Sequence, residues 1–299
     1  MNEQYIDSVV VSSFLEHVWG YYAKHGRHDL PWRLPEPDGT FDPYKILVSE
    51  LMLQQTQVAR VIPKYEAFLR RFPTVETLAE ATLGDVLKQW QGLGYNRRAK
   101  FLWQTAQALR DRGRFPTTTA ELVNLPGIGV NTAGAIQAYA FNQPVLFVET
   151  NIRTVFIHHF FPDQENVSDK AILKLLAHTL SHSQKKEWSA EKSHLFTGAG
   201  GKTGGLSHNR DYYWALMDYG SWLKTTVRTN AQSKHYTRQS KFEGSKRQVR
   251  GQVIRELTAR TMSWSELSTS IQDERLGEVL GELTNEGLIV KKGTEYSLC

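Results

Sequence analysis

Residues 125–134 read LPGIGVNTAG and carry backbone groups that could bind a phosphate. Gly127 and Gly129 let the chain turn tightly, and the helix that follows begins with N–H groups that have no partner inside it. These amides, at the two glycines and at Val130 and Thr132, lie at the positive end of the helix and suit an anion. A glycine pair of this kind is also typical of an ordinary turn between two helices.

Two carboxylates could carry acid–base chemistry, although they lie far apart in the sequence. Glu50 is expected on a helix with Gln54 and Gln57 along a polar stripe, one and two turns further on, which by spacing alone is typical of a solvated face. Glu149 follows a short apolar run and precedes Asn151. A pair of carboxylates can protonate a leaving group and stabilise a sugar cation, as in glycoside hydrolysis.

Further motifs accompany these groups. In chain order they are LPWR at residues 30–33, DPY at 42–44, SELMLQQTQV at 49–58, GLGY at 92–95 with Arg97 and Arg98, and FVETNIR at 147–153. Over residues 15–235 this series resembles the A/G-specific adenine glycosylase branch of the helix-hairpin-helix DNA glycosylases. The run MLQQTQV is the most branch-specific part, because the related endonuclease III proteins differ there. The resemblance implies a mostly α-helical, two-lobed helix-hairpin-helix fold.

The resemblance places the general acid at Glu50, which would protonate adenine N7 and later help to position water. Apolar walls and a second carboxylate would raise the pKa of Glu50. Glu149 would stabilise the sugar cation electrostatically or covalently, with Asn151 as polar support. The family has aspartate at the position of Glu149, and a displacement of about 1 Å can cost on the order of 100-fold in rate. Retained activity, activity on another base and loss of activity therefore all stay open.

The resemblance also predicts which bond is left intact. In bifunctional relatives, a lysine at the position of Asn131 attacks the sugar C1′ and forms a Schiff base, which asparagine cannot do. We therefore expect a monofunctional enzyme that hydrolyses the N-glycosidic bond and leaves an abasic site. The predicted partner is double-stranded DNA containing a mismatch or an oxidised base, with adenine opposite guanine or 8-oxoguanine as the substrate.

Removal of a base requires that it be flipped out of the duplex. By resemblance, Gln55 and Tyr95 wedge into the helix, and the remaining residues of the pocket and the flipping surface are Trp32, Thr56, Leu93, Asn131 and Asp218. Taken singly, such residues are also typical of surface amides, core aromatic side chains and helix caps.

Two features of the family are missing. Most members bind an iron–sulfur cluster through four cysteines, but the corresponding positions here are Lys224, Ala231, Lys234 and Ser240, and the one cysteine is Cys299. We therefore expect no cofactor, and basic side chains of this segment could contact phosphates instead. We also expect no C-terminal domain of the kind by which relatives usually recognise 8-oxoguanine, which leaves that preference open.

The elements that position these residues are mostly helical over residues 1–240. Apolar residues recur at helical spacing after Asp42, Thr118 and Glu121 form a capping-box pattern, and residues 144–148 are the main candidate for a strand. Residues 198–209 are glycine-rich and are expected to form a flexible insertion.

Residues 241–299 read as a basic linker followed by a winged-helix-like module. Residues 224–260 carry ten Lys and Arg against two Glu, which fits either a solvated connection or phosphate contacts. Three helices are expected: one over residues 250–259, one capped by Ser263 with Glu266, and one after Asp273 that ends at Gly287. A hairpin around residues 292–293 would follow. Such modules bind DNA about as often as they bind proteins.

Composition narrows the classes of protein without deciding between them. A net charge of +5 and a pI near 9.1 over 299 residues fit a nucleic-acid partner. The sequence has no run of about 20 apolar residues and no signal-peptide pattern, so we expect a cytoplasmic, nucleoid-associated monomer that binds no membrane.

The adjacent His158 and His159 would point in different directions on a helix, and we expect no metal. Two alternatives stay open: a thymine or uracil mismatch glycosylase, and a non-catalytic lesion sensor.

Overall fold

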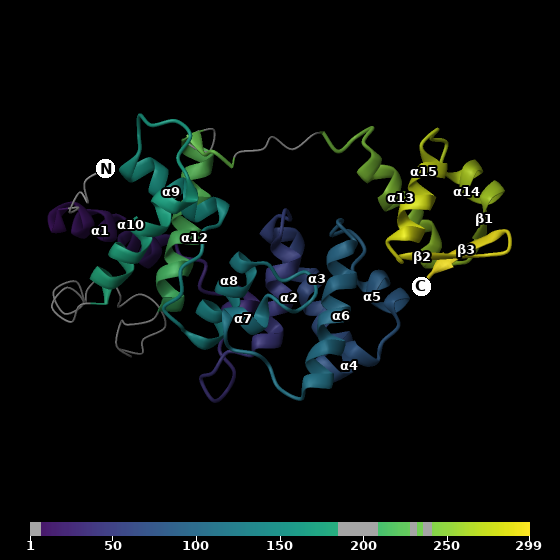
Figure 1. Ribbon diagram of the computed structural model, residues 1–299, viewed down its shortest axis with the longest axis horizontal. Helices are drawn as coiled ribbons and strands as arrows, with labels where there is room; N and C mark the ends of the chain where they lie inside the picture. Colours follow the sequence, from purple (N-terminus) through teal and green to yellow (C-terminus); the bar gives the residue numbers. More distant parts are fainter. Residues whose placement is uncertain (1–6, 185–208, 228–231, 236–240) are drawn as a thin grey trace. The chain divides into compact units, whose positions relative to one another are not determined.

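The computed structural model of the chain describes residues 7–184, 209–227, 232–235 and 241–299, and its elements are labelled in Figure 1. The chain divides into two compact units. Unit 1 comprises residues 1–41 and 130–237, and unit 2 comprises residues 42–129 and 238–299. Most of the predicted glycine-rich insertion, residues 198–208, lies outside the described residues, as do two of the positions compared with cluster cysteines, 231 and 240.

Unit 1 is a group of helices packed through aromatic side chains. Its elements are α1 (Ser8–His25), the 3-10 helix η1 (Pro31–Arg33), α8 (Val130–Phe141), α9 (Thr150–Phe160), α10 (Asp169–Ser183) and α12 (Asn209–Thr226). Helix α12 packs along α9 and also contacts α1 and α8, and Figure 1 shows α9, α10 and α12 side by side. The Phe14 and Phe156 rings lie 5.3 Å apart, and Phe147 stacks on Tyr213 at 4.3 Å. Burial of these large apolar surfaces holds the helices together.

Two glycines permit the closest approaches within unit 1. A Cβ atom at Gly220 of α12 would lie 2.2 Å from the backbone oxygen of Asn151, and one at Gly134 of α8 would lie 2.8 Å from Cβ of Phe147. Neither position has room for a side chain in a core packed to native density. The beginning of α9, where Asn151 lies, is therefore held directly against α12.

The first part of unit 2 is also helical. Its elements are α2 (Pro43–Leu53), α3 (Val58–Arg71), α4 (Val75–Glu80), α5 (Leu83–Gln89), α6 (Arg97–Arg112) and α7 (Thr119–Leu122). Asp42 caps α2 by accepting from the Tyr44 amide at 2.8 Å, and the Tyr44 hydroxyl donates to the carbonyl of Phe72. Proline at the first position of α2 suits this start, because its missing N–H would have no partner there. Thr118 caps α7 by accepting from the Glu121 amide, as predicted.

The second part of unit 2 is the C-terminal segment. Its elements are α13 (Lys246–Ala259), β1 (Met262–Ser263), α14 (Trp264–Ser270), α15 (Leu276–Asn285), β2 (Ile289–Lys292) and β3 (Glu295–Leu298). The strands form an antiparallel sheet in the order β1-β3-β2, with Met262 opposite Tyr296 and Ile289 opposite Leu298. The predicted three helices, the capping box of Ser263 with Glu266 and the hairpin are all confirmed. The assignment of this segment as a separate winged-helix module stays a prediction.

One strand and one helix start predicted from the sequence are wrong. Residues 144–148 form no strand, and the carbonyl of Val145 accepts instead from the hydroxyl of Tyr213. Helix α13 begins at Lys246, four residues before the helix start expected at residue 250, and so occupies most of the last part of the predicted linker. Ion pairs from Lys246 and Arg250 to Glu282 on α15 favour this earlier start, because they hold the first turns of α13 against α15.

The contact at Gly220 predicts a difference between two glycine-to-alanine changes. Gly220→Ala would force α12 away from Asn151 and should lower the melting temperature by roughly 4–8 °C. Gly20→Ala, on α1 of the same unit, has nothing within 4 Å of the added methyl group and should leave the melting temperature unchanged or raise it. Differential scanning calorimetry of both variants checks this, and a stable Gly220→Ala protein would contradict the packing described here.

Candidate active site

Glu50 lies on α2 and is half-buried, one turn before the helix ends at Leu53. The helix is shorter than the sequence predicted, so the expectation that Gln54 and Gln57 lie along the same helix as Glu50 is wrong. Residues 54–57 form a turn, in which Gln55 has a φ of 55°. Such a left-handed backbone ends an α-helix.

The turn after α2 is held by the side chain of Arg98, from the beginning of α6. The Arg98 side chain is buried. Its two terminal guanidinium nitrogens lie within 2.6–3.3 Å of six acceptors, in the last turn of α2 and in two loops, and share their four hydrogens among them. The acceptors are the carbonyls of Leu51, Met52, Gln54, Leu93 and Gly94 and the hydroxyl of Thr56. Arg98 therefore supplies the donors that continuation of α2 would otherwise provide. Burial lowers the pKa of this guanidinium to about 10, so it stays charged at neutral pH.

Arg98 brings together four of the predicted DNA-flipping residues. Gln55 and Thr56 lie in one loop, and Leu93 and Tyr95 lie in the other. Tyr95, like Gln55, has a left-handed backbone, with a φ of 47°, and 37% of its surface is exposed. A non-glycine residue in this conformation stores strain, which is typical of functional sites.

The glycine turn at residues 125–129 is fixed from within unit 2. A Cβ atom at Gly127, whose φ is 74°, would lie 2.6 Å from Phe101 of α6, so glycine is required there for both space and conformation. The hydroxyl of Thr105 donates to the carbonyl of Pro126 at 2.8 Å. Gly127, Gly129 and Val130 are exposed, as is Asn131, and Thr132 is half-buried. The exposed backbone fits the predicted contact with phosphates, which stays a prediction.

Glu149 and Asn151 lie at the beginning of α9 in unit 1. Glu149 is half-buried, and burial raises the pKa of its carboxyl to about 7 against the opposing charge of Arg153. Arg153 is held in turn by two hydrogen bonds to Asp169, at 2.8 and 2.9 Å. Lys224 of α12 donates to the side-chain oxygen of Asn151 at 3.2 Å. The amide of Asn151 is thus positioned from the helix that packs along α9.

Asp218 of α12 accepts from two arginines of the N-terminal segment. Arg33 donates to both carboxylate oxygens, at 2.8 and 2.9 Å, and Arg27 donates through its backbone amide and its side chain. Although burial alone would raise it, the pKa of Asp218 is held below its usual value by the hydrogen bonds and charge of Arg33. Trp32, next to Arg33, is buried. A role of Trp32 and Asp218 toward a base stays a prediction.

The structure places the two predicted catalytic carboxylates in different units, Glu50 in unit 2 and Glu149 in unit 1. That they act on one substrate stays a prediction. Arg98 in unit 2 and Arg33 in unit 1 lie within the motifs found in the sequence, but their role as buried donors was not predicted. A signal for Arg98 was available, because it shares the buried face of α6 with Leu102 and Leu109, at helical spacing.

The residues at the cluster positions do not fit an iron–sulfur cluster. Lys224 donates to Asn151, and the backbone amide of Lys234 donates to the carbonyl of Val167. With Cys299 as the one cysteine, the chain lacks the thiolates that such a cluster requires. Within the described ranges, no three His, Cys, Asp or Glu side chains gather into a metal-binding group. The half-buried His159 shares a hydrogen bond with Tyr219, and burial lowers its pKa to about 4.

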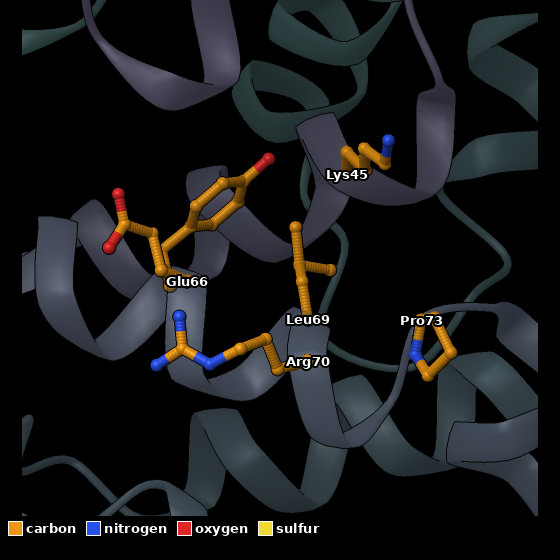
Figure 2. A pocket seen from close by; sticks show the side chains of 6 residues that line it. Lys45, Glu66, Leu69, Arg70 and Pro73 are labelled. Carbon is orange, nitrogen blue, oxygen red and sulfur yellow. The ribbon is translucent and has the colours of Figure 1, made fainter.

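A separate hollow of unit 2 contains none of the predicted site residues. It is lined by Lys45, Tyr65, Glu66, Leu69, Arg70 and Pro73. Figure 2 shows the labelled side chains spread around the hollow rather than converging on one point. The charges of Lys45, Glu66 and Arg70 are mixed, and we assign no function to this hollow.

Comparison with known proteins matches residues 48–179 to the family described as HhH-GPD superfamily base excision DNA repair protein. An adenine DNA glycosylase of Buchnera aphidicola subsp. Baizongia pistaciae (strain Bp) is 41% identical over 169 residues, which are 56% of this chain and 46% of that protein. An adenine DNA glycosylase of Mycobacterium tuberculosis (strain ATCC 25618 / H37Rv) is 44% identical over 136 residues, 45% of this chain and 43% of that protein. The chain thus spans less than half the length of these relatives.

Among solved structures, that of a thermostable thymine-DNA glycosylase has a TM-score of 0.51 and 22% sequence identity. The match covers 71% of this chain and 86% of that chain. This likeness shows the fold. With the family match, it confirms the mostly α-helical glycosylase fold that the sequence motifs predicted. No helix of the described ranges has the length and apolarity needed to cross a membrane.

The raised pKa of Glu149 predicts a pH-dependent contribution to stability. Because the pKa in the folded protein, about 7, exceeds that of a free carboxyl, this contribution is fully present below about pH 4.5 and is lost as the pH rises through about 7. Up to about 3 kcal/mol is involved. Urea unfolding from pH 4.5 to 8 should show wild type losing stability relative to Glu149→Gln, whereas parallel curves would contradict burial of this carboxyl.

The network around Arg98 predicts a contrast between two adjacent arginines. Arg98→Met would leave the carbonyls of both loops without their donor and should lower the free energy of unfolding by about 3 kcal/mol or more. Arg97→Met removes the same charge from an exposed position over the ring of Phe101 and should cost less than about 1 kcal/mol. Equal losses in urea unfolding would show that the Arg98 network contributes little.

Proposed function

We propose, from the premise that residues 48–179 belong to the HhH-GPD superfamily of base excision DNA repair proteins, that this chain is a monofunctional DNA N-glycosylase. Its proposed substrate is adenine opposite guanine or 8-oxoguanine in double-stranded DNA. The observation that carries the proposal is the pair of loops tied by Arg98. They present Gln55 and Tyr95 with left-handed backbones, beside the helix that carries Glu50.

The two strained loops have the properties that opening a duplex requires. A side chain that enters a base stack must keep its direction while the stack resists. Four hydrogen bonds from Arg98 hold the two loops from below the surface. Unstacking and unpairing a base costs a few kcal/mol, which contacts of the inserted side chains can offset. In this proposal Gln55 and Tyr95 fill the space that the flipped base leaves, with Thr56 and Leu93 supporting them.

The chemistry proposed for the flipped adenine uses two carboxyl groups. Glu50 donates a proton to N7, which makes the base a better leaving group, and then orients the attacking water. Glu149 opposes the positive charge that develops on the sugar, an action that requires its ionised form. Since the pKa of Glu149 is raised to about 7, its ionisation should make base release faster as the pH rises through that value. Asn151, held by Lys224, is the proposed polar support for Glu149.

Two further features support the proposed outcome of the reaction. The exposed turn at Gly127 and Gly129 offers backbone amides to a DNA phosphate. Asn131, also exposed, has no amine with which to form a Schiff base. The proposed products are therefore a free base and an abasic site in an intact strand.

The test is single-turnover base release from a duplex with one adenine opposite guanine or 8-oxoguanine. Wild type should release adenine, and Glu50→Gln should slow release by about 1,000-fold or more while binding the duplex with unchanged affinity, because general acid catalysis alone contributes 10²–10⁴-fold. The conservative change removes the transferable proton and keeps the size of the side chain. Release by Glu50→Gln at the wild-type rate would contradict the assigned role, and tight binding without release by wild type would favour a lesion sensor.

A further inference from the structure

The C-terminal segment of unit 2 packs on the part of the unit that carries the strained loops. Helix α13 lies against α5. The side-chain amide of Gln91 donates to the hydroxyl of Thr258 at 3.0 Å, and Lys100 of α6 donates to the carbonyl of Glu286, at the end of α15, at 2.5 Å. The last turn of α13 and the end of α15 are thus tied to residues that flank the Tyr95 loop.

A third contact reaches the loop itself. Arg247, in the first turn of α13, donates a hydrogen bond of 2.6 Å from Nη1 to the phenol oxygen of Tyr95. Its guanidinium carbon lies 5.8 Å from the centroid of the Tyr95 ring, and that of Arg98 lies 5.4 Å from the same centroid. Two guanidinium groups therefore lie within cation–π distance of one exposed aromatic ring.

These two arginines act on different parts of Tyr95. Arg98 accounts for the course of the backbone, because it binds the carbonyls of the residues just before Tyr95. It does not bind the phenol oxygen, which lies at the far end of the side chain. The hydrogen bond from Arg247 restricts rotation of that side chain, and arginine suits this position because it stays charged and presents a rigid, planar set of donors.

We propose that Arg247 is a positioning residue for Tyr95 and that, through it, the C-terminal segment takes part in opening the DNA duplex. This inference rests on the proposed function, in which Tyr95 enters the base stack. The side chain of Tyr95 is held ready by a group from a distant part of the sequence, so that less conformational freedom is lost when the ring inserts. The C-terminal segment thereby acts on base flipping rather than serving only as an additional surface for DNA.

The experiment measures base flipping and base release separately. A duplex with 2-aminopurine at the position of the target adenine reports flipping by increased fluorescence, and single-turnover assays report release. Four proteins are compared: wild type, Arg247→Ala, Tyr95→Phe and the double variant. Tyr95→Phe keeps the ring and removes the oxygen that accepts from Arg247. We expect Arg247→Ala to slow flipping and release by about ten-fold, the effect of losing one charged hydrogen bond, and to have no further effect in the Tyr95→Phe background.

Two control variants separate this role from charge and from packing. Arg255→Ala removes one positive charge from an exposed position on the same helix. Gln91→Ala removes a contact of the C-terminal segment without touching Tyr95. Both should flip and release the base at the wild-type rate, and Arg247→Lys, which keeps a donor, should recover part of the loss.

Several outcomes would overturn the inference. If Arg247→Ala slows flipping equally with and without the Tyr95 oxygen, then Arg247 acts on DNA directly. If either control loses as much as Arg247→Ala, then charge or packing is responsible. Fluorescence that rises and depends on Arg247 while no base is released would support the inference and overturn the proposed function. Base release that is unaffected by Arg247→Ala would support the proposed function and overturn the inference about Arg247. The absence of both flipping and release would overturn the inference and the proposed function together.

Discussion

The buried guanidinium of Arg98 is the interaction on which the predicted DNA-facing surface of unit 2 depends. A charged group removed from water costs several kcal/mol unless polar partners surround it, and carbonyls at the end of a helix need donors of their own. Arg98 and the loops at residues 54–56 and 92–95 satisfy these two needs together. This arrangement stops α2 at Leu53 and allows Gln55 and Tyr95 to keep left-handed backbones. This backbone strain lies at Gln55 and Tyr95, and the buried hydrogen bonds of Arg98 maintain it.

Unit 1 is organised by a buried negative charge, where unit 2 has a buried positive one. There the buried carboxylate of Asp218 gathers Arg27 and Arg33, and so holds the N-terminal segment that carries Trp32 against α12. The same helix presses Gly220 against Asn151 and donates to its side chain through Lys224. In both units, a buried charge surrounded by hydrogen-bond partners connects segments that are distant in sequence, and the residues proposed to meet DNA lie next to that connection. Such networks act as units, so the effects of changing their members are not additive.

Local signals in the sequence predicted the features that depend on a few neighbouring residues. The capping box at Ser263, the end of α15 near Gly287 and the hairpin β2–β3 were of this kind. The family resemblance singled out Gln55 and Tyr95, whose role toward DNA stays a prediction. The end of α2 could not be predicted in this way, because residues 54–57 have ordinary helix propensity and the donor that stops the helix comes from α6. The raised pKa of Glu149 depends on burial by the fold, and the contact of Arg247 with Tyr95 joins positions 152 residues apart.

The central claim, that this fold removes adenine from a mispair, is tested most directly by identifying the base that it sets free. Duplexes with adenine opposite guanine, thymine opposite guanine and uracil opposite guanine are incubated with the full chain. The free bases are then identified by mass spectrometry, and strand integrity is examined before any alkali treatment. The account predicts free adenine from the first duplex and unbroken strands throughout. Release of thymine or uracil without adenine would contradict the proposed substrate, and release of no base from any duplex would contradict glycosylase activity itself.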